Sequence, residues 1–219
     1  MREAIEPSRW IFPVLDDAPD DGPEIIGGDL EPGTLIEAYS KGFFPMPLGR
    51  RNIGWFSPNP RGVLIPDQVH VSRSLRRSMR HFEIHVDTAF DAVVEGCGDP
   101  RRRHGWINSD IRSAYGRLHE MGWAHSVEVF ESGDLVGGLY GVSIGSLFAA
   151  ESKFHRRTDA SKAAVVAMCR ILAGAPDAII DVQWATDHLV TLGVTEVSRS
   201  EYLARLSRAL RAEPPPEFA

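Results

Sequence analysis

The chain has 219 residues, of which 43% are hydrophobic and 25% are charged, so it can bury a full core and has the composition of an ordinary globular protein. Its 24 Lys and Arg against 30 Asp and Glu give a net charge of −6, which excludes binding to nucleic acid through overall charge alone. The N-terminus has no apolar stretch typical of a secretion signal, and no apolar run is long enough to span a bilayer. The two cysteines are far apart, without metal-binding spacing, so we expect a reduced, cytoplasmic protein with no metal site.

Residues 1–68 are rich in Pro, Gly and aromatic residues, and only 32–41 has a helical pattern. We therefore predict a small, loop-rich N-terminal α/β domain over 1–68 and a larger domain over 69–219. The Pro-rich tail is predicted to be disordered from about residue 212.

Regular periodicity appears in the larger domain. Three apolar runs punctuated by Gly, Asp and Ser predict consecutive antiparallel strands, followed by a crossover helix and one more buried strand. This order predicts an α+β fold with a GNAT-like acyltransferase core. The predicted helices are 72–80, 89–96, 110–121 and 160–173, and the predicted strands are 82–86, 125–130, 135–145, 146–154 and 178–183.

The sequence does not support two common enzyme functions, serine hydrolysis and transfer from acetyl-CoA. Gly141, Ser143 and Gly145 match the GxSxG pattern of serine hydrolases, but that pattern requires a strand–turn–helix, and another strand follows here. The loop before the crossover helix, 155–162, contains no glycine to cradle the pyrophosphate of acetyl-CoA. The sequence therefore favours an acyl donor other than acetyl-CoA, and we expect no cofactor.

Arginines form three clusters in this acidic chain. A solvated helix face would explain one such cluster, but three favour contacts with an RNA backbone. Trp55 and Trp106 lie near two of the clusters and could stack on unpaired bases, although a single Trp more often belongs to the core. The clusters are Arg50–51, Arg101–103 and the helical stripe Arg73, Arg76, Arg77 and Arg80.

Many ordered motifs between about residues 12 and 210 resemble the bacterial leucyl/phenylalanyl-tRNA–protein transferases. They are GGDL (27–30), AYSKGFFP (38–45), WFSPNPR (55–61), SRSL (72–75), GWI (105–107), AY (114–115), LH (118–119), AHSVEV (124–129), LVGGLYGV (135–142), ESKF (151–154), ASK (160–162), IDVQ (180–183) and DHL (187–189). The resemblance implies transfer of Leu or Phe from aminoacyl-tRNA to the N-terminal amine of proteins that begin with Arg or Lys. That modification would mark the acceptor protein for degradation, and we expect the enzyme to act as a monomer.

An aminoacyl ester is already activated, so the enzyme must mainly orient the amine and move protons. Asp181 and Gln183 share one face of the predicted strand by alternation, and the resemblance assigns this pair to catalysis. A strand-end Asp held by a neighbouring helix is the alternative. Glu151 matches the acidic residue that faces the site in the family, where it could hold the amine or the cationic side chain of the acceptor.

The resemblance also implies an apolar pocket for the side chain of the donor amino acid, which would select Leu or Phe by size. Two positions depart from the family pattern: Met46 replaces a tryptophan assigned to the terminal adenosine, and Lys153 replaces a pocket methionine. A different aminoacyl donor, a peptidoglycan-peptide acceptor, or a non-catalytic tRNA-binding relative are the competing hypotheses. The predicted substrate-binding residues are Met46, Trp55, Trp106, Tyr115, Leu139, Phe148, Lys153, Val165, Met168, Leu172 and Ile180.

Overall fold

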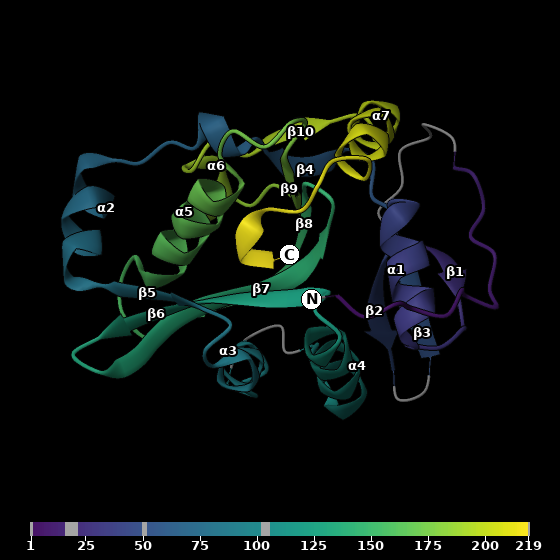
Figure 1. Ribbon diagram of the computed structural model, residues 1–219, viewed down its shortest axis with the longest axis horizontal. Helices are drawn as coiled ribbons and strands as arrows, with labels where there is room; N and C mark the ends of the chain where they lie inside the picture. The colour runs from purple at the N-terminus through teal and green to yellow at the C-terminus, as the bar shows by residue number, and fades with distance from the viewer. Residues whose placement is uncertain (1, 16–21, 50–51, 102–105, 219) are drawn as a thin grey trace.

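The computed structural model describes residues 2–15, 22–49, 52–101 and 106–218, which form two sheets with helices packed around them (Figure 1). The smaller sheet has three antiparallel strands in the order β1-β3-β2, and the larger has seven in the order β10-β4-β9-β8-β7-β6-β5. The strands are β1 (Pro23–Ile26), β2 (Phe44–Leu48), β3 (Asn52–Phe56), β4 (Arg61–Leu64), β5 (Glu83–Val86), β6 (Ala124–Glu131), β7 (Asp134–Ile144), β8 (Leu147–His155), β9 (Ile179–Gln183) and β10 (Thr195–Val197).

The centre of the larger sheet has the architecture expected from the sequence. Strands β6, β7 and β8 form an antiparallel meander, and helix α5 (Ala160–Leu172) crosses over to β9, which pairs parallel to β8. The predicted meander, crossover helix and mixed α+β class are therefore confirmed. The short strands β4 and β10 complete the sheet beyond β9.

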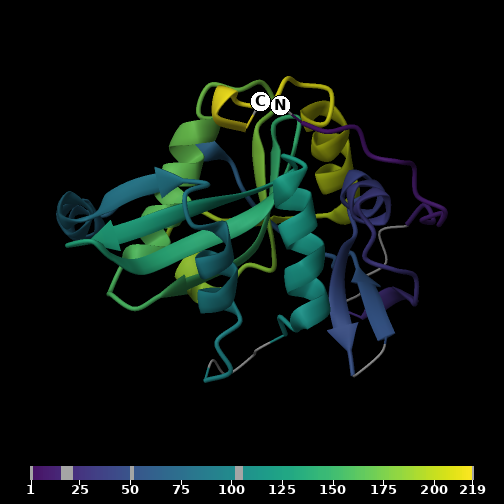
Figure 2. The same ribbon diagram turned by 60° about the horizontal axis from the view of Figure 1, so that its bottom comes forward.

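Helices cover both faces of the larger sheet (Figures 1 and 2). Helix α5, with α2 beside it, lies over β6 and β7 on one face, and α3 and α4 lie on the other. One apolar cluster forms on each face, and the small sheet with α1 packs against the cluster on the α4 side. The remaining helices are α1 (Pro32–Ser40), α2 (Arg73–Ser78), α3 (Phe90–Cys97), α4 (Ser109–Glu120), α6 (Asp187–Val190) and α7 (Arg199–Ala209), with single turns at Pro66–Gln68, Met79–His81 and Pro216–Phe218.

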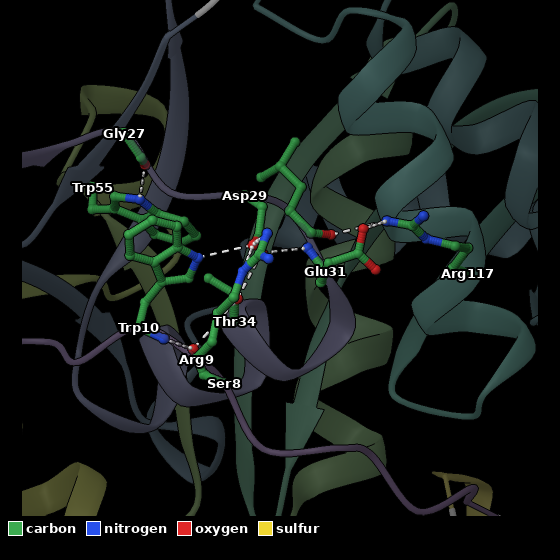
Figure 3. A network of polar contacts seen from close by, with 10 residues as sticks. Ser8, Arg9, Trp10, Gly27, Asp29, Glu31, Thr34, Trp55 and Arg117 are labelled. Carbon is green, nitrogen blue, oxygen red and sulfur yellow. Dashed lines mark hydrogen bonds and ion pairs between the residues drawn. The ribbon is translucent and has the colours of Figure 1, made fainter.

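Asp29 fixes the start of α1 and the N-terminal arm (Figure 3). One carboxylate oxygen accepts hydrogen bonds from the Glu31 amide at 3.1 Å and the Thr34 hydroxyl at 2.7 Å. The other accepts bonds from Arg9 and from the Trp10 indole. These bonds lower the pKa of Asp29 to about 2, although burial alone would raise it. The GGDL segment therefore serves as an anchor that orients α1.

Residues 212–218 have a defined structure that packs on the larger sheet, contrary to the predicted disorder from about residue 212. Phe218 is buried and stacks on His125, with ring centroids 4.1 Å apart, and also lies beside Phe148. Arg2 donates a hydrogen bond to the Phe218 carbonyl at 3.2 Å. Burial of Phe218 holds the tail in place. The Pro-rich composition of the tail does not reveal the effect of this one aromatic side chain.

Both cysteines are reduced and buried. None of the helices in the described part of the chain is long and apolar enough to cross a bilayer. Among the same residues, no group of His, Cys, Asp or Glu side chains is arranged to hold a metal ion.

A candidate active site where two strands separate

Strands β8 and β9 pair only along part of their length. Their parallel register ends at Ala149 and Asp181, although β8 continues to His155 and β9 to Gln183. Glu151 and Gln183 each lie two residues beyond this last pair. The separation of the strands therefore opens a gap in the sheet that is bordered by a carboxyl group and an amide.

Two cavities meet at this gap. The first, which we call the side-chain cavity, has a volume of about 170 Å³ and a mostly apolar wall. The second, which we call the aromatic cavity, has a volume of about 150 Å³ and is lined by Phe44, Pro45, Met46, Trp106, Glu151, Gln183 and Trp184. Glu151, Gln183 and Trp184 line both cavities.

Glu151 is held by two tyrosines from different helices. Tyr39 of α1 donates a hydrogen bond to one carboxyl oxygen at 2.6 Å, and Tyr115 of α4 donates to the other at 2.9 Å. Burial raises the pKa of Glu151 to about 7, against the two hydrogen bonds, which act to lower it. The group therefore changes its charge close to neutral pH, as expected of a residue that accepts and returns a proton.

Asp181 is in a different situation because four donors surround its carboxylate. Arg61 binds both oxygens, at 2.8 and 2.6 Å, and the Tyr202 hydroxyl donates at 2.9 Å. The Gln183 amide N–H donates at 3.0 Å. Asp181 and Arg61 are almost fully buried, and the carboxylate raises the pKa of Arg61 although burial opposes this. Both oxygens of the Asp181 carboxylate are therefore fully hydrogen-bonded within the protein.

The guanidinium of Arg61 also joins the two sheets. It lies over the rings of Phe44 and Tyr202, at 4.9 and 4.5 Å from their centroids, and donates to the Gly42 carbonyl at 3.1 Å. Phe44 belongs to β2 of the small sheet, whereas Tyr202 belongs to α7. The ion pair thus lies directly behind the gap and ties both of its sides together.

Gln183 has a strained backbone conformation. Its φ is +63°, and the Trp184 N–H donates to the Val182 carbonyl at 2.7 Å, which closes a three-residue γ-turn with Gln183 at its centre. The prediction that the side chains of Asp181 and Gln183 share one strand face is wrong. The turn ends the strand alternation, so Gln183 borders the two cavities while Asp181 points to Arg61 and Tyr202. The Gln183 side chain is 6% exposed, and its amide nitrogen has no hydrogen-bond partner among the described residues.

Several predicted substrate-binding residues do line the cavities. Leu139, Val165 and Ile180 line the side-chain cavity, with Lys153 at the same wall. Met46 and Trp106 line the aromatic cavity. Tyr115 is fully buried and supports Glu151.

Other predicted positions lie behind the site. Phe148, Met168 and Leu172 are fully buried in the core cluster under α5, and they are not among the residues that line the side-chain cavity. Trp55 is 1% exposed and donates its indole N–H to the Gly27 carbonyl at 2.8 Å. Its predicted role in base stacking is therefore wrong, because the ring is enclosed by the core of the small sheet, edge-on against Phe12.

The arginine stripe lies on the surface. Arg73, Arg76, Arg77 and Arg80 are all exposed on α2 and the turn that follows it. Ser78 of α2 bonds to Asp159 at the start of α5, at 2.8 Å. Of the other clusters, Arg101 pairs locally with Asp99, and residues 50, 51, 102 and 103 lie outside the described part of the chain.

Several basic groups act on His188 of α6. Burial lowers the pKa of His188, and the positive charges of Lys153, Lys162 and His155 lower it further. Lys162 belongs to the first turn of α5 and donates to the Thr191 hydroxyl at 2.8 Å. His188 therefore lies near several basic groups, and the acidic Asp159 acts against their effect on its pKa.

Four residues of the site were missed from the sequence: Tyr39, Arg61, Trp184 and Tyr202. Tyr39 and Arg61 lie inside the motifs AYSKGFFP and WFSPNPR, and Trp184 directly follows Gln183, so the sequence marked these positions as candidates. Their roles depend on partners that are distant in sequence, and periodicity gives no information about such partners.

The sequence of the chain matches a family of known proteins. A family model described as leucyl/phenylalanyl-tRNA protein transferase matches residues 63–207, and the model for the N-terminal domain of that family matches residues 28–59. A leucyl/phenylalanyl-tRNA–protein transferase from Aromatoleum aromaticum is 45% identical over 94% of this chain and 89% of its own length. The protein of that name from Tolumonas auensis is 49% identical over 84% and 80%, and that from Oleidesulfovibrio alaskensis is 46% identical over 91% and 85%.

Solved structures with some likeness include a GCN5-related N-acetyltransferase from Kribbella flavida. It covers 76% of this chain and 61% of its own, with 13% identity and a TM-score of 0.39. The L-PGS structure from Bacillus licheniformis covers 73% and 55%, with 11% identity and a TM-score of 0.38.

Proposed function

This chain belongs to the leucyl/phenylalanyl-tRNA–protein transferase family and is an aminoacyltransferase, and we propose that it moves Leu or Phe from tRNA to the N-terminal amine of proteins beginning with Arg or Lys. The observation that carries this proposal is the pair Glu151 and Gln183, set between an apolar and an aromatic cavity. The product would be a degradation signal. The enzyme would act in the cytoplasm. It would act as a monomer, because one chain provides both cavities.

The two cavities suit the two ends of the donor ester. A Leu or Phe side chain fits the apolar wall of the side-chain cavity, where Leu139, Val165 and Ile180 would select it by size. The terminal adenosine of tRNA fits the aromatic cavity, where Trp106 offers a ring for stacking and Met46 an adaptable apolar contact. The ester bond would then lie beside Glu151 and Gln183.

Glu151 is the best-suited proton acceptor. An α-amine has a pKa of about 7.7–8.0, close to the value of about 7 for Glu151, so a proton can pass between them with little cost. The amine nitrogen attacks the ester carbonyl, a C–N bond forms, and the C–O bond to the tRNA breaks. Of the two protons that the ammonium group loses, one passes through Glu151 to the departing 3′-oxygen and the other goes to solvent.

Gln183 and Asp181 take separate roles in this scheme. The unpartnered amide nitrogen of Gln183 is available to donate to the carbonyl oxygen as negative charge develops there. The sequence suggested Asp181 as the group that collects the proton, but its oxygens already accept four hydrogen bonds. We therefore assign Asp181 to holding the Gln183 turn and Glu151 to the proton transfer.

The rate of transfer is expected to rise as pH passes through about 7, because only the ionised form of Glu151 accepts a proton. The acceptor ammonium group loses its proton to become the neutral nucleophile near pH 8, so the rate should rise in a second step and level off only above that. Measuring kcat/KM against pH with two Arg peptides, one with a less basic α-amine, separates them. The step near 7 should stay in place while the other moves; a single step that moves with the peptide would remove Glu151 from this role.

The exposed arginines of α2 are expected to bind the tRNA backbone. Replacing Arg76, Arg77 and Arg80 together with Ala should weaken binding to all aminoacyl-tRNAs alike and make the slope of log K against log salt shallower, by roughly 0.7–0.9 per lost contact. The matched control is Arg205, Arg208 and Arg211 of the α7 region changed to Ala, where Arg205 and Arg208 already pair with carboxylates. If both triple variants keep the wild-type slope, α2 is a solvated helix face.

The direct test of the function is transfer of label from a pool of aminoacyl-tRNAs, each carrying one labelled amino acid, to peptides that begin with Arg, Lys or Ala. Label from Leu and Phe should enter only the Arg and Lys peptides, and an acetylated Arg peptide should remain unlabelled. Label from another amino acid would identify a different donor, which is the possibility that Lys153 raises. Transfer to the Ala peptide would contradict the proposed acceptor.

A further inference from the structure

Trp184 separates the two cavities of the site. Trp184 lines both of them, as do Glu151 and Gln183, where the ester is proposed to lie. An indole at this position forms the end of the side-chain cavity on one side and part of the aromatic cavity on the other. The proposed reaction gives Trp184 no role, although it lies next to Gln183.

The indole is held rigidly by the small sheet. It meets Phe44 edge-on, with ring centroids 5.1 Å apart and an angle of 89°, and it meets Phe56 at 6.4 Å and 67°. These two rings are themselves stacked at 6.0 Å. Because edge-to-face aromatic packing fixes orientation as well as distance, Trp184 cannot swing away easily when a ligand presses on it.

The backbone of Trp184 is fixed as well. Its N–H closes the turn at Gln183, and the Gln183 N–H is bound to Asp181, which Arg61 and Tyr202 hold. On its other side lies Gly62, where an added Cβ would come within 2.7 Å of the Trp184 carbonyl carbon and the Ala185 nitrogen. The backbone of β4 therefore packs closely against the turn and leaves no room for a side chain at residue 62.

We propose that Trp184 is the wall that limits the size of the donor side chain, an inference that rests on the proposed transfer of amino acids from tRNA. A cavity of about 170 Å³ with a fixed end excludes side chains that are too long, since a rigid wall does not adapt. Removal of the indole frees the volume of the ring itself and opens the boundary with the neighbouring cavity, so a longer side chain can enter. Trp184 is therefore a specificity-determining residue that acts by contact.

The test compares Trp184→Ala, Trp184→Leu and Trp184→Phe with the wild type. One tRNA body is charged in turn with Leu, Phe, Met and Trp, so that contacts to the RNA stay constant, and kcat/KM is measured with an Arg peptide. Trp184→Ala is expected to raise the ratio of Trp to Leu transfer at least about 10-fold, with Trp184→Leu intermediate and Trp184→Phe close to wild type. A thermal unfolding curve for each variant confirms that it is folded.

The ratio distinguishes the wall from a purely structural residue. Loss of structure lowers transfer of all four amino acids by the same factor, so ratios that match wild type in all three variants would overturn the proposal. A wild-type enzyme that transfers none of the four would contradict the proposed function itself, whereas a transferring wild type with unchanged ratios in the variants contradicts only the role of Trp184.

Discussion

Replacing Glu151 with Gln is expected to lower the rate of aminoacyl transfer by about 10²–10⁴-fold, the usual contribution of a positioned acid–base group. Gln has nearly the same shape and can still bond to Tyr39 and Tyr115, so the fold and the affinity for tRNA should stay close to wild type. It cannot accept a proton at neutral pH. Single-turnover kinetics with a preformed complex of enzyme and aminoacyl-tRNA measures the chemical step directly.

The matched control for this variant is Glu128→Gln. Glu128 is another carboxyl of the larger sheet and is fully buried, bonded to the hydroxyls of Thr88 and Ser126, but it lies on β6 and does not line either cavity of the site. Its change to Gln should leave the chemical step within a few-fold of wild type. Equal losses in the two variants, or full activity in Glu151→Gln, would show that Glu151 takes no part in moving the proton.

Replacing Arg61 with Met is expected to destabilise the protein by about 3–5 kcal/mol, because it leaves the Asp181 charge buried without its partner. The loss should appear as a lower midpoint in urea unfolding with an unchanged slope. Changing Asp181 to Leu in the same chain should recover much of the stability, since an apolar pair of similar volume often replaces a buried ion pair without loss.

An exposed ion pair provides the comparison for this second prediction. Arg205 pairs with Glu201 one helical turn away on α7, where both groups are partly exposed, so Arg205→Met should change stability by less than about 1 kcal/mol. If Arg61→Met has an effect as small as this, Asp181 must take up a proton or reach water when its partner is lost. The double variant would then show no recovery.

Local signals in the sequence were enough to predict the centre of the larger sheet. Gly133 at a tight turn, together with the apolar runs on either side of it, specifies the antiparallel pair β6 and β7. The crossover helix follows from a single apolar stretch. By contrast, β4 and β10 have only four and three residues, and their partners are distant in the chain, so no short-range pattern identifies them.

The residues of the candidate site also divide into those that local sequence signals identify and those whose roles depend on distant partners. Glu151 and Gln183 could be identified because they lie at the ends of recognisable strands in motifs with a family resemblance. Whether Asp181 can act as the proton acceptor could not be judged from the sequence. Its partner Arg61 is 120 residues away, and its partner Tyr202 lies on helix α7. The positive φ of Gln183 was equally hidden, because a left-handed conformation is expected at Gly or Asn rather than at Gln.

The bond between Arg61 and Asp181 also has a consequence for the newly made chain. At a synthesis rate of 5–20 residues per second, Asp181 follows Arg61 out of the ribosome after about 6 to 24 s. During this interval Arg61 lacks the carboxylate that pairs with it in the folded protein, and Tyr202, whose ring lies under its guanidinium, has not yet been made. The ion pair that ties the two sides of the gap together can therefore form only late in translation, and the candidate site is incomplete until then.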